Sequence, residues 1–157
     1  MPSFPHLLSR SINIQKWIGE TTSAATTTID SSALDMSGYE GLIAIGSIAT
    51  TATDNGLSIW ISTSTSTAQM EAVKGSFLVA DSATSLVIDI GVLPFKGRAN
   101  GRFAFARYRR TTSSKLGPLY AIRYGARNAP VDNGTNATQN YLALGSPSTG
   151  SNTDTTT

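Results

Sequence analysis

The sequence contains no cysteine and a single histidine, His6, among its 157 residues. The lack of cysteine excludes a disulfide framework, a cysteine nucleophile, and zinc or iron–sulfur sites with cysteine ligands. A Ser–His–Asp triad would have to use His6, which lies close to a terminus, where chains are usually poorly ordered. We therefore expect no catalytic site, no metal site and no cofactor.

Charge and long apolar runs are also scarce. Charged residues make up 14% of the chain, against roughly 25% in ordinary soluble domains. No apolar run approaches the roughly 18 residues that a membrane helix needs, so we expect no membrane-spanning segment. Serine and threonine supply 41 of the 157 positions. The common phosphate-loop, HExxH, calcium-loop and GxSxG motifs are absent from the sequence.

The net charge of +2 conceals a segregation of charge along the chain. Residues 17–95 hold eight acidic residues and Lys74, a net charge of −7, whereas residues 96–127 hold nine basic residues and no acid. Such blocks are expected where a surface meets a copy of itself or an acidic partner. Two alternatives stay open: the blocks can neutralise each other by cross-strand pairs in one sheet, or the basic block can bind nucleic acid.

Short runs of alternating apolar residues predict β-strands. The run LSIWIST places Leu57, Ile59 and Ile61 on one face and leaves Trp60 on the other. SLVIDIG, RFAFARYRR and LYAIRYGAR also alternate, and GLIAIGSI is apolar on both faces, which is typical of a central strand. No stretch gives a convincing helix. The sequence therefore predicts an all-β fold, either an antiparallel β-sandwich or a jelly-roll-like barrel.

Turn signals connect the expected strands. Asn55–Gly56 is a strong hairpin signal because both residues tolerate a positive φ, so we expect the strands on its two sides to pair. Asp35 precedes a Ser–Gly turn, where an aspartate commonly accepts hydrogen bonds from nearby backbone amides. The segment 70–81, MEAVKGSFLVAD, is compatible with either a short helix or an edge strand.

Composition divides the chain into three parts. Residues 1–33 are expected to form an extended N-terminal arm with one or two short strands, residues 34–127 the sandwich core, and residues 128–157 a polar, partly disordered C-terminal arm. Trp17 argues against complete disorder of the first arm, because a solvated tail seldom carries tryptophan. Tyr141 could anchor the second arm on a neighbouring subunit or on its own domain.

Two stretches resemble a known family. ALDMSGYEGLIAIGSI, residues 33–48, is similar to the opening of small β-rich structural proteins of tailed bacteriophages, in which a hydrophobic strand follows. GRANGRFAFARYRR and the later LYAIRYGARNAPVDN resemble the last two strands of those proteins and their closing Ala–Pro–Val stretch. The likeness covers about residues 33–132, and it departs from the family in the STSTST loop and in the number of arginines.

The resemblance implies a non-enzymatic virion component: a minor capsid, cement or decoration protein on the outer surface of the phage head. Its partners would be the major capsid protein and copies of itself, expected as a homotrimer, with neither a membrane nor nucleic acid as partner. Arginines of the basic block and scattered aromatic residues are suited to such contacts. We expect charged contacts from Arg102, Arg107, Arg109, Arg110 and Arg123, and apolar anchors from Trp17, Trp60, Tyr120 and Tyr141.

Other functions are consistent with the same residues. Trp60 and the tyrosines could stack on sugars in a carbohydrate-binding or adhesin module of a phage particle, although no acid–aromatic cluster accompanies them in the sequence. The chain could also be another head–tail structural protein. The run RFAFARYRR is a weak signal for nucleic-acid binding, in which case the affinity would fall steeply with salt.

Overall fold

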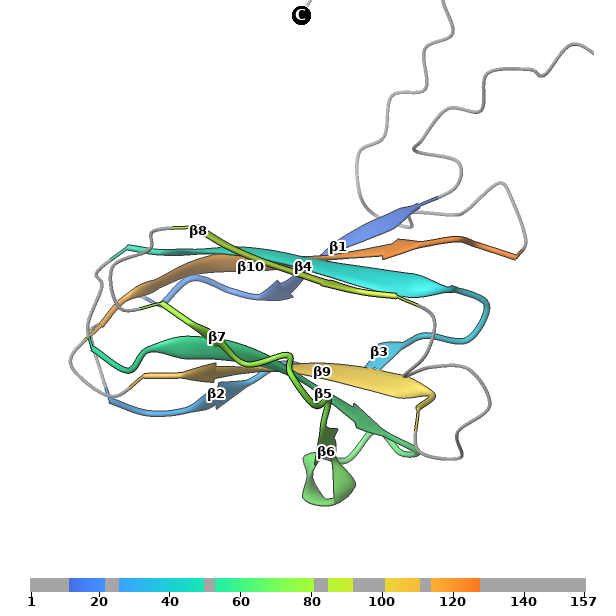
Figure 1. Cartoon of the computed structure of the whole chain (residues 1–157), viewed down its shortest axis with the longest axis horizontal. Helices are drawn as coiled ribbons and strands as arrows, with labels where there is room; N and C mark the ends of the chain where they lie inside the picture. The colour runs from blue at the N-terminus through green and yellow to red at the C-terminus, as the bar shows by residue number, and fades with distance from the viewer. Residues whose placement is uncertain are drawn as a thin grey trace, which may run out of the picture.

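Two antiparallel sheets pack face to face, with the hydrophobic core between them (Figure 1). The computed structural model describes residues 12–21, 26–49, 53–80, 85–91, 101–110 and 114–127 of the chain. Within these ranges the only helical element is one 3₁₀ turn, η2 (Thr67–Gln69). The predicted all-β fold, an antiparallel sandwich, is confirmed.

The first sheet has four strands, and all its neighbours are antiparallel. β10 and β4 are central, and β1 and β8 are the edges. Both edge strands are continuous over six residues. In order across the sheet, the strands are β1 (Asn13–Ile18), β10 (Leu116–Tyr124), β4 (Gly41–Ile48) and β8 (Ser85–Ile90).

The second sheet has two long central strands and two interrupted edges. β9 (Phe103–Arg109) and β5 (Gly56–Ser62) pair along their whole length. Each edge consists of two-residue pieces, because a short excursion of the chain interrupts the ladder. Beside β9 lie β2 (Ile29–Asp30) and β3 (Leu34–Asp35), and beside β5 lie β6 (Glu71–Ala72) and β7 (Leu78–Val79).

Strand alternation decides which side chains enter the core. Leu57, Ile59 and Ile61 on β5 point into the core and are buried. Trp60, which lies between Ile59 and Ile61 in the sequence, is on the outer face, as the pattern predicts. Burial alternates in the same way along β4 and β8. Tyr108 on β9 is the largest fully buried side chain. Its hydroxyl donates to the backbone oxygen of Ser47 at 3.3 Å, which links the two sheets.

The predicted hairpin at Asn55–Gly56 is wrong. The chain does turn here, at Asp54, which has a φ of 61°, but β4 and β5 lie in different sheets. Both flanks of β4 are taken by β10 and β8, and both flanks of β5 by β9 and the β6 and β7 pieces. Asn55 is buried, and its backbone oxygen accepts a hydrogen bond from the Ala80 N–H at 2.8 Å. The turn therefore carries the chain across the sandwich.

The described part of the N-terminal arm is built into the sandwich. β1 pairs with β10, and β2 pairs with β9 in the other sheet. Trp17 is 4% exposed within the core, and its Nε1 donates to the backbone oxygen of Ser32 at 2.9 Å. The short strands expected in residues 1–33 are present, but they are strands of the sandwich itself. Residues 1–11 and 128–157, which include Tyr141, lie outside the described residues.

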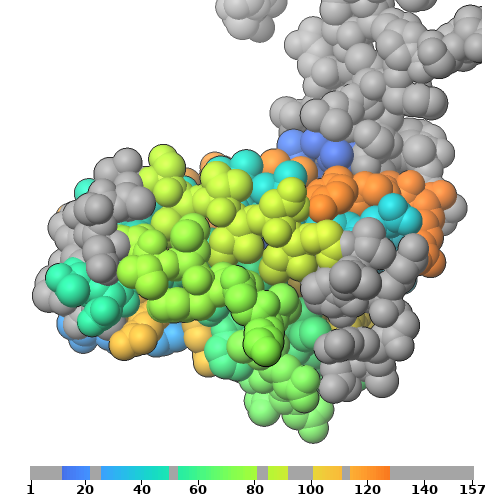
Figure 2. All heavy atoms as spheres, in the orientation of Figure 1, coloured from blue at the N-terminus to red at the C-terminus, as the bar shows by residue number. Residues whose placement is uncertain are grey.

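The described part of the segment 70–81 forms an edge and not a helix. Its described residues include β6 and β7, which both pair with β5. Gly75, with a φ of 83°, lies in the turn between them. Figure 2 shows η2 and β6 in green, projecting from the lower edge of the sandwich.

Candidate functional site

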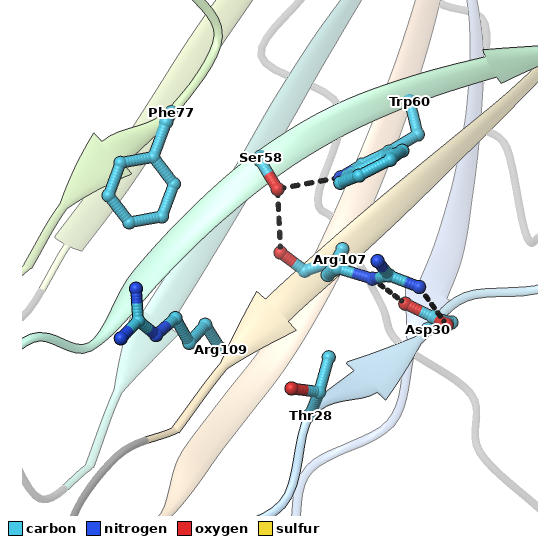
Figure 3. Close-up of a pocket in the computed structure, with 7 residues that line it drawn as sticks. All are labelled: Thr28, Asp30, Ser58, Trp60, Phe77, Arg107 and Arg109. Atoms are coloured by element: carbon cyan, nitrogen blue, oxygen red, sulfur yellow. Dashed lines mark hydrogen bonds and ion pairs between the residues drawn. The ribbon is translucent and has the colours of Figure 1, made fainter. Parts of the chain in front are cut away.

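A hollow of about 490 Å³ lies on the outer face of the second sheet (Figure 3). It crosses three strands, because β9 supplies its middle while β5 and the β2 region supply its two sides. Figure 3 shows Phe77 and Arg109 on one side and Trp60, Arg107 and Asp30 on the other. The hollow is lined by Thr28, Asp30, Ser58, Trp60, Phe77, Arg107 and Arg109.

The sheet register explains why these side chains meet. Arg107 and Arg109 point outward from β9, because Tyr108 between them points into the core. Gly56 on β5 lies opposite Arg109. A Cβ atom at Gly56 would lie 2.6 Å from Cε2 and Cζ of Phe77. The glycine therefore gives the Phe77 ring room to lie close over β5.

One wall of the hollow is held rigidly by Arg107. Its Nε donates to Oδ1 of Asp30 at 2.6 Å and its Nη2 to Oδ2 at 2.9 Å, a two-pronged ion pair between neighbouring strands. The guanidinium also lies over the Trp60 ring, 4.5 Å from its centroid. Trp60 in turn donates from Nε1 to the Ser58 hydroxyl at 2.9 Å. Stacking and forked hydrogen bonding together fix the guanidinium before any ligand arrives.

The other wall of the hollow carries Arg109, a cation with no ion-pair partner among the described residues. The Arg109 side chain is exposed and makes no ion pair or hydrogen bond within the described parts of the chain. Phe77 beside it is 49% exposed. An unpaired guanidinium next to a half-exposed aromatic ring is suited to bind a group that combines a negative charge with apolar surface.

Trp60, Arg107 and Arg109 were predicted from the sequence as contact residues, whereas Phe77 was not. The feature of the sequence that could have indicated an exposed Phe77 is the Lys74–Gly75 turn, which follows β6. With the turn in place, the residues after it alternate as a strand: Phe77 and Val79 are about half exposed, while Ala80 is buried.

Two other predicted contact arginines lie near Asp35, away from the hollow. Arg102 forms an ion pair with the Asp35 carboxylate, with 2.9 Å between Nη2 and Oδ2. Arg123 donates to the Asp35 backbone oxygen and to the Asn13 side chain, and it lies over the Tyr39 ring. Together with Asp30–Arg107, the Asp35–Arg102 pair supports the alternative in which the acidic and basic blocks neutralise each other between neighbouring strands.

Arg110 and Trp17 lie inside the subunit. Arg110 is 6% exposed, and its guanidinium donates to Thr27 and to the backbone oxygen of Ser114. Trp17 packs in the core. We therefore correct their assignment: both act within this chain and are not available as surface contacts. Tyr120 is 42% exposed on the outer face of the first sheet, as an anchor would need to be.

The Asp35–Arg102 pair predicts a small dependence of stability on acidity. Hydrogen bonds from Arg102 and from the Ser37 N–H hold the pKa of Asp35 below its ordinary value of 3.8, although partial burial opposes them. A carboxylate with a lowered pKa stabilises the fold above its unfolded pKa and loses that contribution as the pH falls through its folded pKa. The free energy of unfolding should thus decrease below about pH 4.

The check is urea denaturation at about pH 6 and about pH 3 for the wild type and for Arg102→Ala. The difference between the two pH values should shrink in Arg102→Ala and stay unchanged in the control Arg127→Ala. We expect a modest effect that high salt weakens, since both side chains of the pair are solvent-exposed. An unchanged difference in Arg102→Ala would show that the pair does not set the acid sensitivity.

The turn assigned to Asp35 is confirmed, because its Oδ1 accepts a hydrogen bond from the Ser37 N–H at 2.9 Å. In the part of the chain that the structure describes, no group of three or more His, Asp or Glu side chains is placed to hold a metal ion. The same part contains no helix with the length and hydropathy needed to cross a membrane.

Comparisons with known proteins give no family. No family model matches the sequence, and no curated protein matches it. One solved structure that matches comes from Bacillus endospore appendages, described as a novel family of disulfide-linked pili. It is 19% identical, covers 73% of this chain and 88% of that chain, and has a TM-score of 0.41. This distant likeness carries no conclusion about function, and the phage resemblance stays a prediction.

Proposed function

We propose that this chain is a non-enzymatic structural protein of a bacteriophage head: a cement or decoration protein that binds the major capsid protein at the outer surface. Self-association is part of this proposal, and the homotrimer stays a prediction of the phage resemblance. One observation carries the proposal: Arg109, a cation without an ion-pair partner among the described residues, lies beside the half-exposed ring of Phe77 in the hollow of the second sheet. Arginine and aromatic residues are enriched among those that dominate protein–protein binding energy.

The chemistry of the hollow suggests that of its partner. Asp30 neutralises Arg107, so Arg109 leaves the hollow with a net positive charge. A capsid subunit that presents a carboxylate to Arg109 and an apolar side chain to Phe77 would be complementary. The wall formed by Arg107 and Trp60 is already ordered, which reduces the entropy lost on binding.

The same geometry supports binding more than catalysis. Asp30 is the carboxylate that lines the hollow, and both of its oxygens accept hydrogen bonds from Arg107. The Asp30 carboxylate is thus already engaged by a residue of its own chain. A sugar would find the Asp30 oxygens occupied and one face of Trp60 covered by Arg107.

The direct test is cosedimentation of the chain with empty heads of the bacteriophage that encodes it. Arg109→Glu should weaken head binding by tenfold or more, because it replaces an attractive charge by a repulsive one at the centre of the contact (about 1.4 kcal/mol per tenfold). Phe77→Ala should weaken binding to a similar extent. Arg127→Glu, an equal change of charge at an exposed position outside the hollow, is the matched control and should bind nearly as the wild type does.

Two outcomes would contradict the proposal. If the wild type does not bind heads, the phage assignment fails. If Arg109→Glu binds as well as Arg127→Glu does, the hollow is not the contact. A glycan array provides the complementary check: binding by the wild type that disappears in Trp60→Ala would favour the adhesin alternative.

A further inference from the structure

The outer face of the four-stranded sheet carries an apolar strip on the side of the sandwich opposite the hollow. Four of its side chains are between 38% and 57% exposed, and two more are half-buried. Single exposed apolar side chains are ordinary, whereas a contiguous group indicates a surface that contacts another protein. The strip consists of Ile14, Ile43, Ile45, Val87, Tyr120 and Ile122.

The register of the sheet arranges this face as two neighbouring rows that run across all four strands. From β1 to β8, the first row is Lys16, Tyr120, Ile45 and Val87. The second row, in the same direction, is Ile14, Ile122, Ile43 and Asp89. Side chains within a row are about 5 Å apart, and residues two apart along a strand share a face at about 7 Å. Apolar groups thus fill the middle, and opposite charges occupy two diagonal corners.

The acidic corner is fixed in position. Oδ1 of Asp89 accepts a hydrogen bond from the Tyr124 hydroxyl at 2.9 Å. Burial and the neighbouring carboxylate raise the pKa of Tyr124, which keeps the hydroxyl protonated as a donor. Asp89 is therefore held at the β8 edge, while Lys16 lies exposed at the β1 edge.

We propose that this face binds the same face of a second copy of the chain, about a two-fold axis close to the strand direction. In such a pair β1 of each copy lies over β8 of the other. Lys16 of one copy is then within side-chain reach of Asp89 of its partner, and the reverse contact forms by symmetry. Sheets that pack in this way lie about 10 Å apart with their strands within about 30° of each other.

The charge pattern is the reason to choose a second copy as the occupant. A complementary surface must be apolar at its centre, with an acid opposite Lys16 and a base opposite Asp89. Turned over about the two-fold axis, the face places Lys16 of one copy above the β8 edge of the other, one row (about 7 Å) from Asp89, because its two charges lie on opposite edges. Removing both apolar strips from water drives the association, and the charged corners set its register.

This inference deepens the proposed function, because it names the surface through which copies associate. The hollow lies on the outer face of the other sheet, which forms the opposite layer of the sandwich in Figure 1, so pairing leaves it open on both copies. The two hollows of a pair would face in opposite directions, so one of them can contact the head while the other faces away from it. Association through this face gives a dimer, whereas the phage resemblance implies a trimer.

The test is the mass of the full chain in solution, measured by light scattering after size exclusion. It is measured at about 50 mM and about 500 mM salt. We expect the mass of two chains of 16.5 kDa. Val87→Glu should yield monomers, because it places a charge within the apolar strip. The matched control is Val79→Glu. Val79 lies on the other sheet and is 50% exposed, close to the 57% of Val87. The Val79→Glu variant should remain a dimer. A wild type that is a monomer or a trimer at low salt, or equal effects of the two variants, would overturn the inference.

A charge exchange tests the orientation. Lys16→Glu alone and Asp89→Lys alone should each weaken pairing by about tenfold, because each brings like charges together at both corners. The double variant should recover pairing to within a few fold of the wild type. Circular dichroism checks that each variant is folded. Failure of the double variant to recover would exclude this orientation. The Arg109→Glu variant should stay paired, so loss of head binding and loss of pairing are separable results.

Discussion

Replacement of Tyr108 by alanine should lower the free energy of unfolding by about 3–5 kcal/mol. The side chain is fully buried between the sheets, and nothing in the core can fill the volume that its ring leaves. The Ser47 backbone oxygen would also lose the hydroxyl that donates to it. Since a domain of this kind is stable by about 5–15 kcal/mol, the variant should lose a large share of its stability. Urea denaturation followed by circular dichroism measures the change.

Two further variants separate the contributions of Tyr108. Tyr108→Phe keeps the ring and should cost only about 1 kcal/mol, the usual value of one hydrogen bond. Tyr120→Ala removes the same atoms from a position exposed in the single subunit and, at a dilution at which the chain is monomeric, should cost clearly less than Tyr108→Ala. Burial raises the pKa of Tyr108 far above its ordinary value, so the hydroxyl keeps its proton as a donor into strongly alkaline solution. Equal losses for Tyr108→Ala and Tyr120→Ala would contradict the core position.

Arg110→Ala should lower the free energy of unfolding by about 2–4 kcal/mol. Its Nε donates to the Thr27 backbone oxygen at 2.9 Å and its Nη1 to that of Ser114 at 3.4 Å. The side chain thereby ties the segment before β2 to the segment before β10. Alanine would leave both carbonyl oxygens without this donor, and the loss is destabilising above all at Ser114, because that residue is fully buried.

The neighbouring arginine is the matched control. Arg109→Ala should change the free energy of unfolding by no more than about 0.5 kcal/mol, because the side chain is exposed and unpaired in the described structure. The same variant should weaken head binding, whereas Arg110→Lys should destabilise the fold because lysine cannot reproduce the forked donors. If both alanine variants are equally stable, Arg110 is not the tie that its contacts indicate.

The faces of the strands could be predicted from the sequence, whereas their partners could not. Burial alternates along a strand as a local property, so Leu57, Ile59 and Trp60 were placed correctly. Asn55–Gly56 specifies only that the chain turns. Which strand then lies beside β5 depends on β9, more than 40 positions later, and on the competition of β8 and β10 for the flanks of β4.

The candidate site was predictable to a similar extent. The outward alternation of Arg107 and Arg109 is visible in RFAFARYRR, and the exposed position of Trp60 follows from its own strand. The pairing of Arg107 with Asp30 joins residues 77 positions apart, so it depends on tertiary structure. The burial of Arg110 has the same origin, since its Thr27 partner is 83 positions away.

The pairing of β1 with β10 has a consequence for biosynthesis. Among the described strands β1 is made first and β10 last, with Asn13 and Arg123 separated by 110 positions. At about 5–20 residues per second, a ribosome needs roughly 5–20 seconds to produce that interval, longer than many β-sandwiches take to fold. Until then β1, which carries Trp17, has no neighbouring strand in its sheet. The first sheet is completed only when translation has passed residue 124, which makes closure of this sandwich a late event in the life of each nascent chain.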